Sequence, residues 1–109
     1  MPYIAPQHRQ ELDPLIDALA ERLVQEADKM HHEAAFAGLL NYTCTCLALK
    51  IVRRQFGRLR YWLIALITGT FKNVADEFYR RLGAPYEDQQ INLYGDVDLY
   101  AQFLKEIEK

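Results

Sequence analysis

Polar and aromatic residues able to do chemistry are concentrated in one stretch, EFYRRLGAPYEDQQINLYGD, which runs from Glu77 to Asp96. The stretch holds three tyrosines, two arginines and four carboxylates around the break Gly83-Ala84-Pro85. Carboxylates can bind Mg²⁺ or transfer protons, whereas arginine and tyrosine are common anchors of protein interfaces. This composition therefore allows a catalytic site, a binding surface, or a structural contact between two helical segments.

Two acid–arginine pairs favour the structural contact. On a helix, Asp76 and Arg80, like Glu77 and Arg81, would be four residues apart with the acid first, which is the favourable orientation. The arginines therefore have local partners and need no ligand. We predict a clamp across the Gly83-Pro85 break that also borders a self-association surface. Its members are Tyr79, Arg80, Arg81, Tyr86, Glu87 and Asp88.

A second group of candidates lies in the basic middle of the chain. Residues 34–75 contain six basic residues and no acid, whereas residues 1–33 and 76–109 each carry a net charge of −4, giving −2 overall. Arginines followed by Tyr61 and Trp62 could bind a phosphate or a single-stranded nucleic acid. We favour the alternative in which acidic helices flank a basic middle, because the acidic remainder would repel a polyanion. The anion-binding candidates are Arg53, Arg54, Arg58 and Arg60.

The histidines and cysteines do not have the spacing of a metal site. His31, His32 and Glu33 are adjacent, so on a helix their side chains would point about 100° apart. Cys44 and Cys46 would lie on nearly opposite sides of a helix and cannot pair with each other. The chain has no H-x-x-x-H, no C-x-x-C and no phosphate-binding glycine loop. We expect no metal and no cofactor.

Apolar residues recur at steps of three and four, which is typical of helices. The spacing predicts helices over residues 14–31 and 35–55, and a third that begins near Leu59 and continues past Leu82. Asp13-Pro14 resembles a helix start, with a capping residue followed by proline at the first helical position. We expect the third helix to be kinked or broken at Gly83-Pro85, since proline removes a backbone hydrogen bond.

The second predicted helix is apolar on most of its circumference, which indicates burial by more than one neighbour. Its main stripe consists of Leu40, Cys44, Leu47 and Ile51. A short C-terminal helix, capped by Asp96 or Asp98, is expected to point four apolar residues inward: Leu99, Phe103, Leu104 and Ile107. We therefore predict an all-α fold, a bundle of three main helices with a short C-terminal helix, in a single helical domain over residues 1–109.

The composition is that of a globular protein, with 50% hydrophobic and 26% charged residues. The longest apolar run, Tyr61 to Phe71, is too short to span a bilayer, and MPYIAPQHRQELD has no apolar run after a basic start, unlike a signal peptide. In a chain without a recognisable secretion signal, the two cysteines indicate reduced thiols. We expect a cytoplasmic protein without a membrane partner.

Several segments resemble a family of short uncharacterised proteins of bacteria, archaea and their phages. The matching segments include LDPLID at 12–17, EFYRR-x3-APYED at 77–88 and GDV at 95–97. The resemblance implies a small cytoplasmic helical protein. The chain departs from the family pattern at Lys72 and Asn73, where an acidic residue is expected, and at Tyr94, where asparagine is expected. Both departures argue against catalysis by carboxylates.

These observations favour a non-enzymatic interaction module that self-associates, because a helix apolar on all sides is hard to cover within 109 residues. One alternative is an all-α nucleotide pyrophosphohydrolase that binds Mg²⁺ through paired carboxylates, which Asp17, Glu21 and Asp28 with Asp76 and Glu77 imitate only loosely. Another is a nucleic-acid-binding accessory protein that uses the arginine-rich turn.

Overall fold

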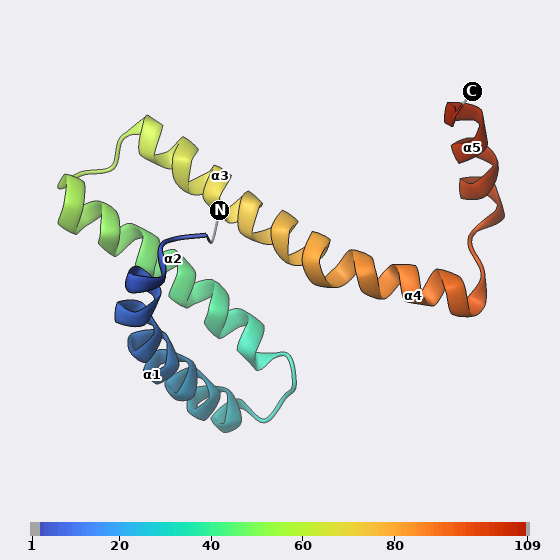
Figure 1. Cartoon of the computed structure of the whole chain (residues 1–109). Helices are drawn as coiled ribbons and strands as arrows, with labels where there is room; N and C mark the ends of the chain where they lie inside the picture. The colour runs from blue at the N-terminus through green and yellow to red at the C-terminus, as the bar shows by residue number, and fades with distance from the viewer. Residues whose placement is uncertain (1–2, 109) are drawn as a thin grey trace. The chain divides into compact units, whose positions relative to one another are not determined.

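The computed structural model describes residues 3–108 and contains helices joined by short turns (Figure 1). No strand occurs among these residues, so the predicted all-α class is confirmed. The helices are α1 (Pro6–Met30), α2 (Ala35–Phe56), α3 (Tyr61–Phe78), the π-helical turn η1 (Tyr79–Gly83), α4 (Ala84–Tyr94) and α5 (Asp98–Glu108).

The chain divides into two compact units between Thr70 and Phe71. In the first unit, α1 and α2 run antiparallel and pack against each other as a helical hairpin (Figure 1). The turn between them begins at His31, which adopts the left-handed conformation (φ 58°) that commonly ends a helix. The end of α1 at Met30 agrees with the predicted boundary.

The predicted start of the first helix at Asp13-Pro14 is wrong, since α1 begins at Pro6. Pro6 lies in the first turn, where its missing N–H is not needed. The backbone N–H groups of His8 and Arg9 both donate to the carbonyl of Ala5. Pro14 lies inside the helix, where it omits one backbone bond without ending the regular structure on either side.

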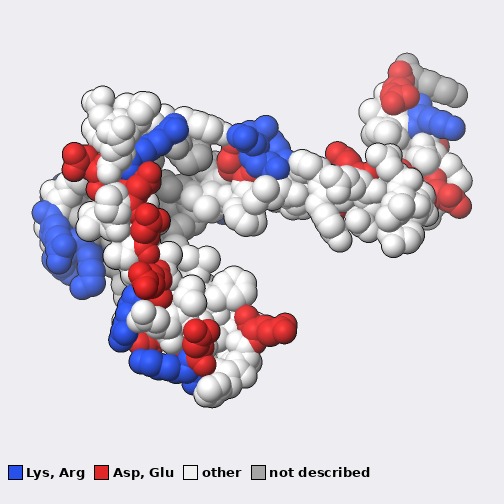
Figure 2. All heavy atoms as spheres, turned by 60° about the horizontal axis from the view of Figure 1, so that its bottom comes forward, with Lys and Arg blue, Asp and Glu red and all other residues white. Residues whose placement is uncertain are grey.

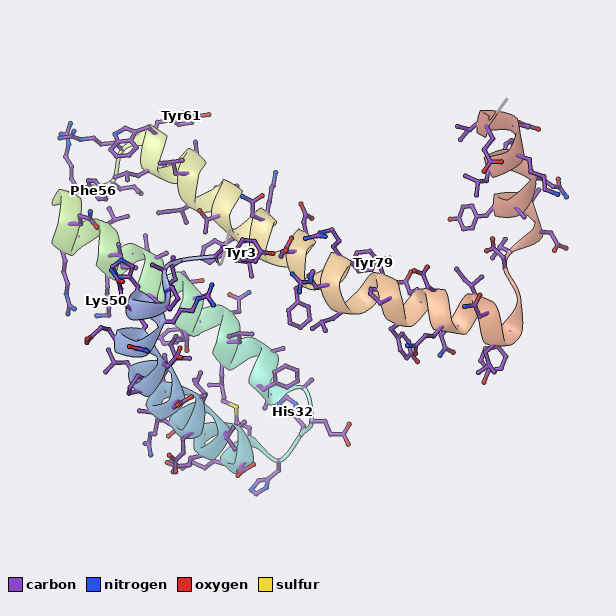
Figure 3. The ribbon with its side chains drawn as sticks, in the orientation of Figure 1. Tyr3, His32, Lys50, Phe56, Tyr61 and Tyr79 are labelled. Atoms are coloured by element: carbon purple, nitrogen blue, oxygen red, sulfur yellow. The ribbon has the colours of Figure 1, made fainter. Side chains whose placement is uncertain are left out.

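The corner between α2 and α3 also belongs to the first unit. Gly57 takes a positive φ of 82° there, which glycine adopts without steric cost. The rings of Phe56 and Trp62 meet edge to face, with centroids 5.4 Å apart. Figure 3 shows Phe56 at the end of α2 and Tyr61 at the start of α3. Leu63, just beyond the corner, is buried.

In the second unit, the helix that continues from α3 does not end at Gly83-Pro85, so the predicted alternative of a broken helix is wrong. Tyr79–Gly83 form a π-helical turn, and α4 follows at once. The N–H of Ala84 donates to the carbonyl of Tyr79, five residues back. This wider turn changes the backbone pairing immediately before Pro85, which has no N–H to donate. The deformation predicted from the proline is therefore a π-helical turn within a continuous helical segment.

Helix α5 begins at Asp98, and the carboxylate of Asp96 accepts a 2.7 Å hydrogen bond from the N–H of Val97. The apolar residues predicted to point inward are all more than half exposed, so that prediction is wrong for the single chain. They share one helical face. They are Leu99, Phe103, Leu104 and Ile107.

Among residues 3–108, the buried positions are only Ala35, Val52 and Leu63. The contact between separate helices that is clearly formed is α1 against α2. A core of this size is small for the number of apolar side chains that the sequence supplies.

Candidate functional site

The predicted clamp residues lie in and around the π-helical turn η1, on the segment where Figure 3 labels Tyr79. The hydroxyl of Tyr79 donates a 2.8 Å hydrogen bond to the carboxylate of Glu87, eight residues along the chain. The tyrosine ring lies against Gly83, where an added Cβ would come within 2.6 Å of ring atom Cδ2. Glycine at position 83 therefore lets the Tyr79 side chain pass close to the backbone and reach Glu87.

The bond to Glu87 also changes the acidity of the tyrosine. It raises the pKa of Tyr79, and partial burial of the hydroxyl and the negative charges of Glu87 and Asp88 act in the same direction. Tyr79 is thus held in its neutral, donating form. An activated tyrosine would need a lowered pKa, so this environment does not favour Tyr79 as a nucleophile.

The two arginines of the group bind one carboxylate. Arg80 contacts Glu77 with N–O distances of 2.7 and 2.9 Å from Nη2, and Arg81 Nη1 lies 3.8 Å from Glu77 Oε1. The Arg80 pair has a spacing of three residues, whereas the sequence pattern pointed to Asp76. Both arginine side chains are at least 60% exposed, whereas that of Glu77 is 24% exposed. The contacts are therefore local to one helical turn.

Tyr86 is exposed like the two arginines, with 61% of its surface accessible. Glu87 lies in the first turn of α4. The structure thus joins Tyr79 to Glu87 and Glu77 to both arginines. The close approach of Tyr79 to Gly83 was not predicted, although an aromatic residue four positions before a helical glycine is a recognisable signal.

The larger candidate surface lies on α2. The sequence predicted that this helix is buried by several neighbours, but the described chain covers little of it. Leu40, Leu47 and Ile51 are 52%, 53% and 50% exposed and recur on one helical face. We call these three residues the apolar stripe. The apolar stripe therefore stays about half exposed in the described chain.

The anion-binding candidates lie at the end of the apolar stripe. Lys50 and Arg54 line a hollow of about 310 Å³ together with Leu47, Ile51 and Gln55. Lys50 and Arg53 line a second hollow on another side of α2, with Leu49, Val52 and Leu59. Arg53 also donates a 2.8 Å hydrogen bond to the carbonyl of Gly57, which stabilises the helix end.

We call Lys50, Arg53, Arg54, Arg58 and Arg60 the basic cluster. All five residues are exposed. None of them forms an ion pair within residues 3–108.

The histidines and cysteines are not gathered into a metal-binding group. His31 and His32 lie in the turn after α1, whereas Cys44 and Cys46 are half-buried free thiols on α2. Within residues 3–108, no three histidine, cysteine or carboxylate side chains are grouped as metal ligands.

Helix α2 is also long and apolar enough to cross a membrane, judged by length and composition alone. It has 22 residues, and its most apolar window has a mean hydropathy of 1.5. A core helix of a soluble protein meets the same criteria, but only 11% of this window is buried in the chain. The sequence-based argument against a membrane considered Tyr61 to Phe71 and overlooked this helix.

Comparison with protein families gives a match over residues 1–97, to a domain of unknown function named DUF6899. The chain belongs to the DUF6899 family. The matched region of the DUF6899 domain includes the hairpin, the basic cluster and the π-helical turn, and it ends just before α5. Neither the curated proteins nor the solved structures gave a match.

Proposed function

We propose that this DUF6899 protein is a non-enzymatic interaction module that self-associates through the α1–α2 hairpin. The observation that supports the proposal is the exposed apolar stripe on α2. Similar exposure occurs on α1, at Leu15, Ile16 and Val24. Contiguous apolar surface of this kind is typical of protein–protein interfaces.

The energetics indicate how large such an interface must be. Complete burial of a leucine or isoleucine contributes roughly 1.5–3 kcal/mol, so half-exposed side chains would gain about half of that. Six such side chains, three from each copy, would contribute about 5–9 kcal/mol. Association itself costs an estimated 4–15 kcal/mol. The apolar stripe alone is therefore marginal, and the proposed interface extends onto the exposed apolar residues of α1.

A second copy suits α2 better than a lipid bilayer. The part of α2 without charged residues, Ala35 to Leu49, spans about 22 Å at 1.5 Å per residue. A typical hydrocarbon core is about 30 Å thick. The segment also contains Asn41, whose side-chain amide is costly to place in a hydrocarbon core. We therefore propose a cytoplasmic protein with no membrane partner and no cofactor.

We include two structural features in this proposal. They are the bundle of three main helices and the single domain over residues 1–109. Bundle packing would be completed on association, when helices of a second copy cover the open side of the hairpin. Two copies of a helical hairpin form a four-helix arrangement with short connections. Such an arrangement buries apolar faces that one hairpin leaves exposed.

The experiment compares the molar mass of wild-type protein and a Leu47→Gln/Ile51→Gln variant by light scattering at micromolar concentration. The proposal predicts an oligomer for the wild type and a shift toward the monomer for the variant. A matched control, Leu104→Gln/Ile107→Gln, makes the same chemical change on α5 and should remain oligomeric. Equal dissociation of both variants would contradict the assignment of the interface to α2.

A further inference from the structure

Charged groups in the first unit are arranged in two exposed sets of opposite sign. On α1, acidic residues recur at positions that share one helical face, and we call them the acidic stripe. They are Asp13, Asp17, Glu21 and Asp28, all exposed. The other set is the basic cluster at the end of α2 and in the following turn. Figure 2 shows acidic side chains in a column, other basic side chains at both ends of this column, and a separate group of basic side chains at the left edge of the view.

Neither set is neutralised within the described chain. Glu26, also on α1, pairs with Arg22 at 2.8 Å and with Lys29 at 3.1 Å. In contrast, no member of the acidic stripe or of the basic cluster takes part in an ion pair within residues 3–108. Both sets lie in the same unit, but their side chains do not meet there. A partner with a basic surface opposite the acidic stripe and an acidic surface opposite the basic cluster could neutralise both sets at once.

A second copy of the chain is such a partner. In a two-fold symmetric dimer the same surface meets itself, so each contact occurs twice. The acidic stripe of one copy can then lie against the basic cluster of the other, and the reverse contact forms at the same time. The apolar stripe adjoins Lys50 and Arg54, which line the same hollow as Leu47 and Ile51. This gives an apolar centre with a charged rim, as in typical interfaces.

We propose, on the basis of the self-association proposed above, that the dimer is two-fold symmetric and pairs the acidic stripe of each copy with the basic cluster of the other. The apolar stripe supplies most of the burial, while the charges set the orientation and speed up encounter. The basic middle of the chain is thus explained by a contact between copies. A nucleic acid bound to the basic cluster would instead be repelled by the acidic stripe, because both carry negative charge.

Complementary charge reversal tests this arrangement. The acid-reversed variant carries Asp17→Lys and Glu21→Lys, and the base-reversed variant carries Lys50→Glu and Arg54→Glu. In a homodimer of either variant, like charges face each other twice, so we expect the dissociation constant to rise about tenfold or more. When the two variants are mixed, every reversed group meets an opposite charge, so a heterodimer should form with near wild-type affinity.

Native mass spectrometry of the mixture distinguishes the heterodimer from both homodimers, and circular dichroism checks that each variant keeps its helical content. A control pair, Lys105→Glu and Glu106→Lys on α5, should leave the dissociation constant unchanged. The wild-type protein gives an independent measurement, since its association should weaken between 0.05 and 0.5 M NaCl, where the Debye length falls to a few ångströms.

The possible results separate this proposal from the proposed function. If both reversed variants form homodimers as tightly as the wild type, the charge pairing is wrong while self-association stands. If the wild type itself is monomeric, the proposed self-association is wrong, and the charge pairing that rests on it is wrong as well. If oligomers disappear after nuclease treatment, the basic cluster binds nucleic acid, and the pairing between copies is overturned.

Discussion

The hydroxyl of Tyr79 donates a hydrogen bond of 2.8 Å to Glu87, so one side chain spans the whole π-helical turn Tyr79–Gly83. The two residues lie on opposite sides of the Gly83-Pro85 sequence, which would otherwise favour the end of a helix. The bond ties the last turn of the incoming helix to the first turn of α4. It thereby stabilises the continuous helical segment that the structure shows.

The Tyr79–Glu87 bond predicts a specific dependence of stability on pH. The pKa of Tyr79 is raised above its ordinary value of 10.0, chiefly by the hydrogen bond to Glu87. The stabilising contribution is therefore complete below pH 10 and is lost as the pH rises through the raised pKa. Tyr79→Phe should melt slightly below the wild type at pH 8. This difference should shrink as the pH rises through the raised pKa of Tyr79, because the ionised hydroxyl can no longer donate to Glu87, whereas the other tyrosines titrate in both proteins. A difference that is constant with pH would contradict the role of the hydroxyl.

Gly83→Ala tests the close approach of the Tyr79 ring. An alanine inside a helix normally stabilises it by about 0.5–1 kcal/mol relative to glycine. At position 83 the new Cβ would displace the ring, which lies 2.6 Å away, and break the bond to Glu87. We expect no gain in the free energy of unfolding in the wild type, but the full gain in a Tyr79→Ala background.

Gly69→Ala is the matched control for this substitution. Gly69 lies inside α3, and an added Cβ would have no atom within 4 Å. The free energy of unfolding, measured by urea denaturation, should rise by about 0.5–1 kcal/mol in both backgrounds. Equal gains at positions 69 and 83 in the wild type would show that the ring does not occupy the space beside Gly83.

The two arginines should contribute unequally to stability. Arg80 binds Glu77 at 2.7 and 2.9 Å, whereas Arg81 lies 3.8 Å away. Exposed ion pairs contribute about 0.2–1 kcal/mol. In urea denaturation, Arg80→Ala should lower the free energy of unfolding by about 1 kcal/mol, whereas Arg81→Ala should lower it by only about 0.2 kcal/mol. A larger loss for Arg81→Ala would contradict the geometry of this contact.

The histidines and cysteines should bind no structural metal. Elemental analysis of protein purified without a histidine tag should find far less than one zinc per chain. A stoichiometric metal, removed only when the protein unfolds, would show that His31, His32, Cys44 and Cys46 converge in an assembly.

The helical class and most helix boundaries could be predicted from apolar spacing, because that spacing is a local property of the sequence. The start of α1 was misplaced, since Asp13-Pro14 has the pattern of a helix start but lies inside α1, which begins at Pro6. The π-helical turn was not predicted, because the pattern indicated a kink or break at Gly83-Pro85 but not the bond from the Ala84 N–H to the Tyr79 carbonyl. Local spacing also pointed to Asp76 for Arg80, whereas side-chain geometry brings it to Glu77.

The burial of α2 shows a further limit of sequence patterns. The apolar circumference of the helix indicates that it needs covering, but it does not say whether the cover comes from the same chain. In the described chain, Leu40, Leu47 and Ile51 stay about half exposed. The sequence therefore identified the apolar helix but did not predict how much of it the chain leaves exposed.

The molar mass of the wild-type protein in solution is the most direct test of the account. Light scattering coupled to size-exclusion chromatography, at micromolar concentration and after nuclease treatment, should give twice the chain mass of 12.7 kDa or a higher multiple. A mass near 12.7 kDa under these conditions would contradict self-association through the hairpin.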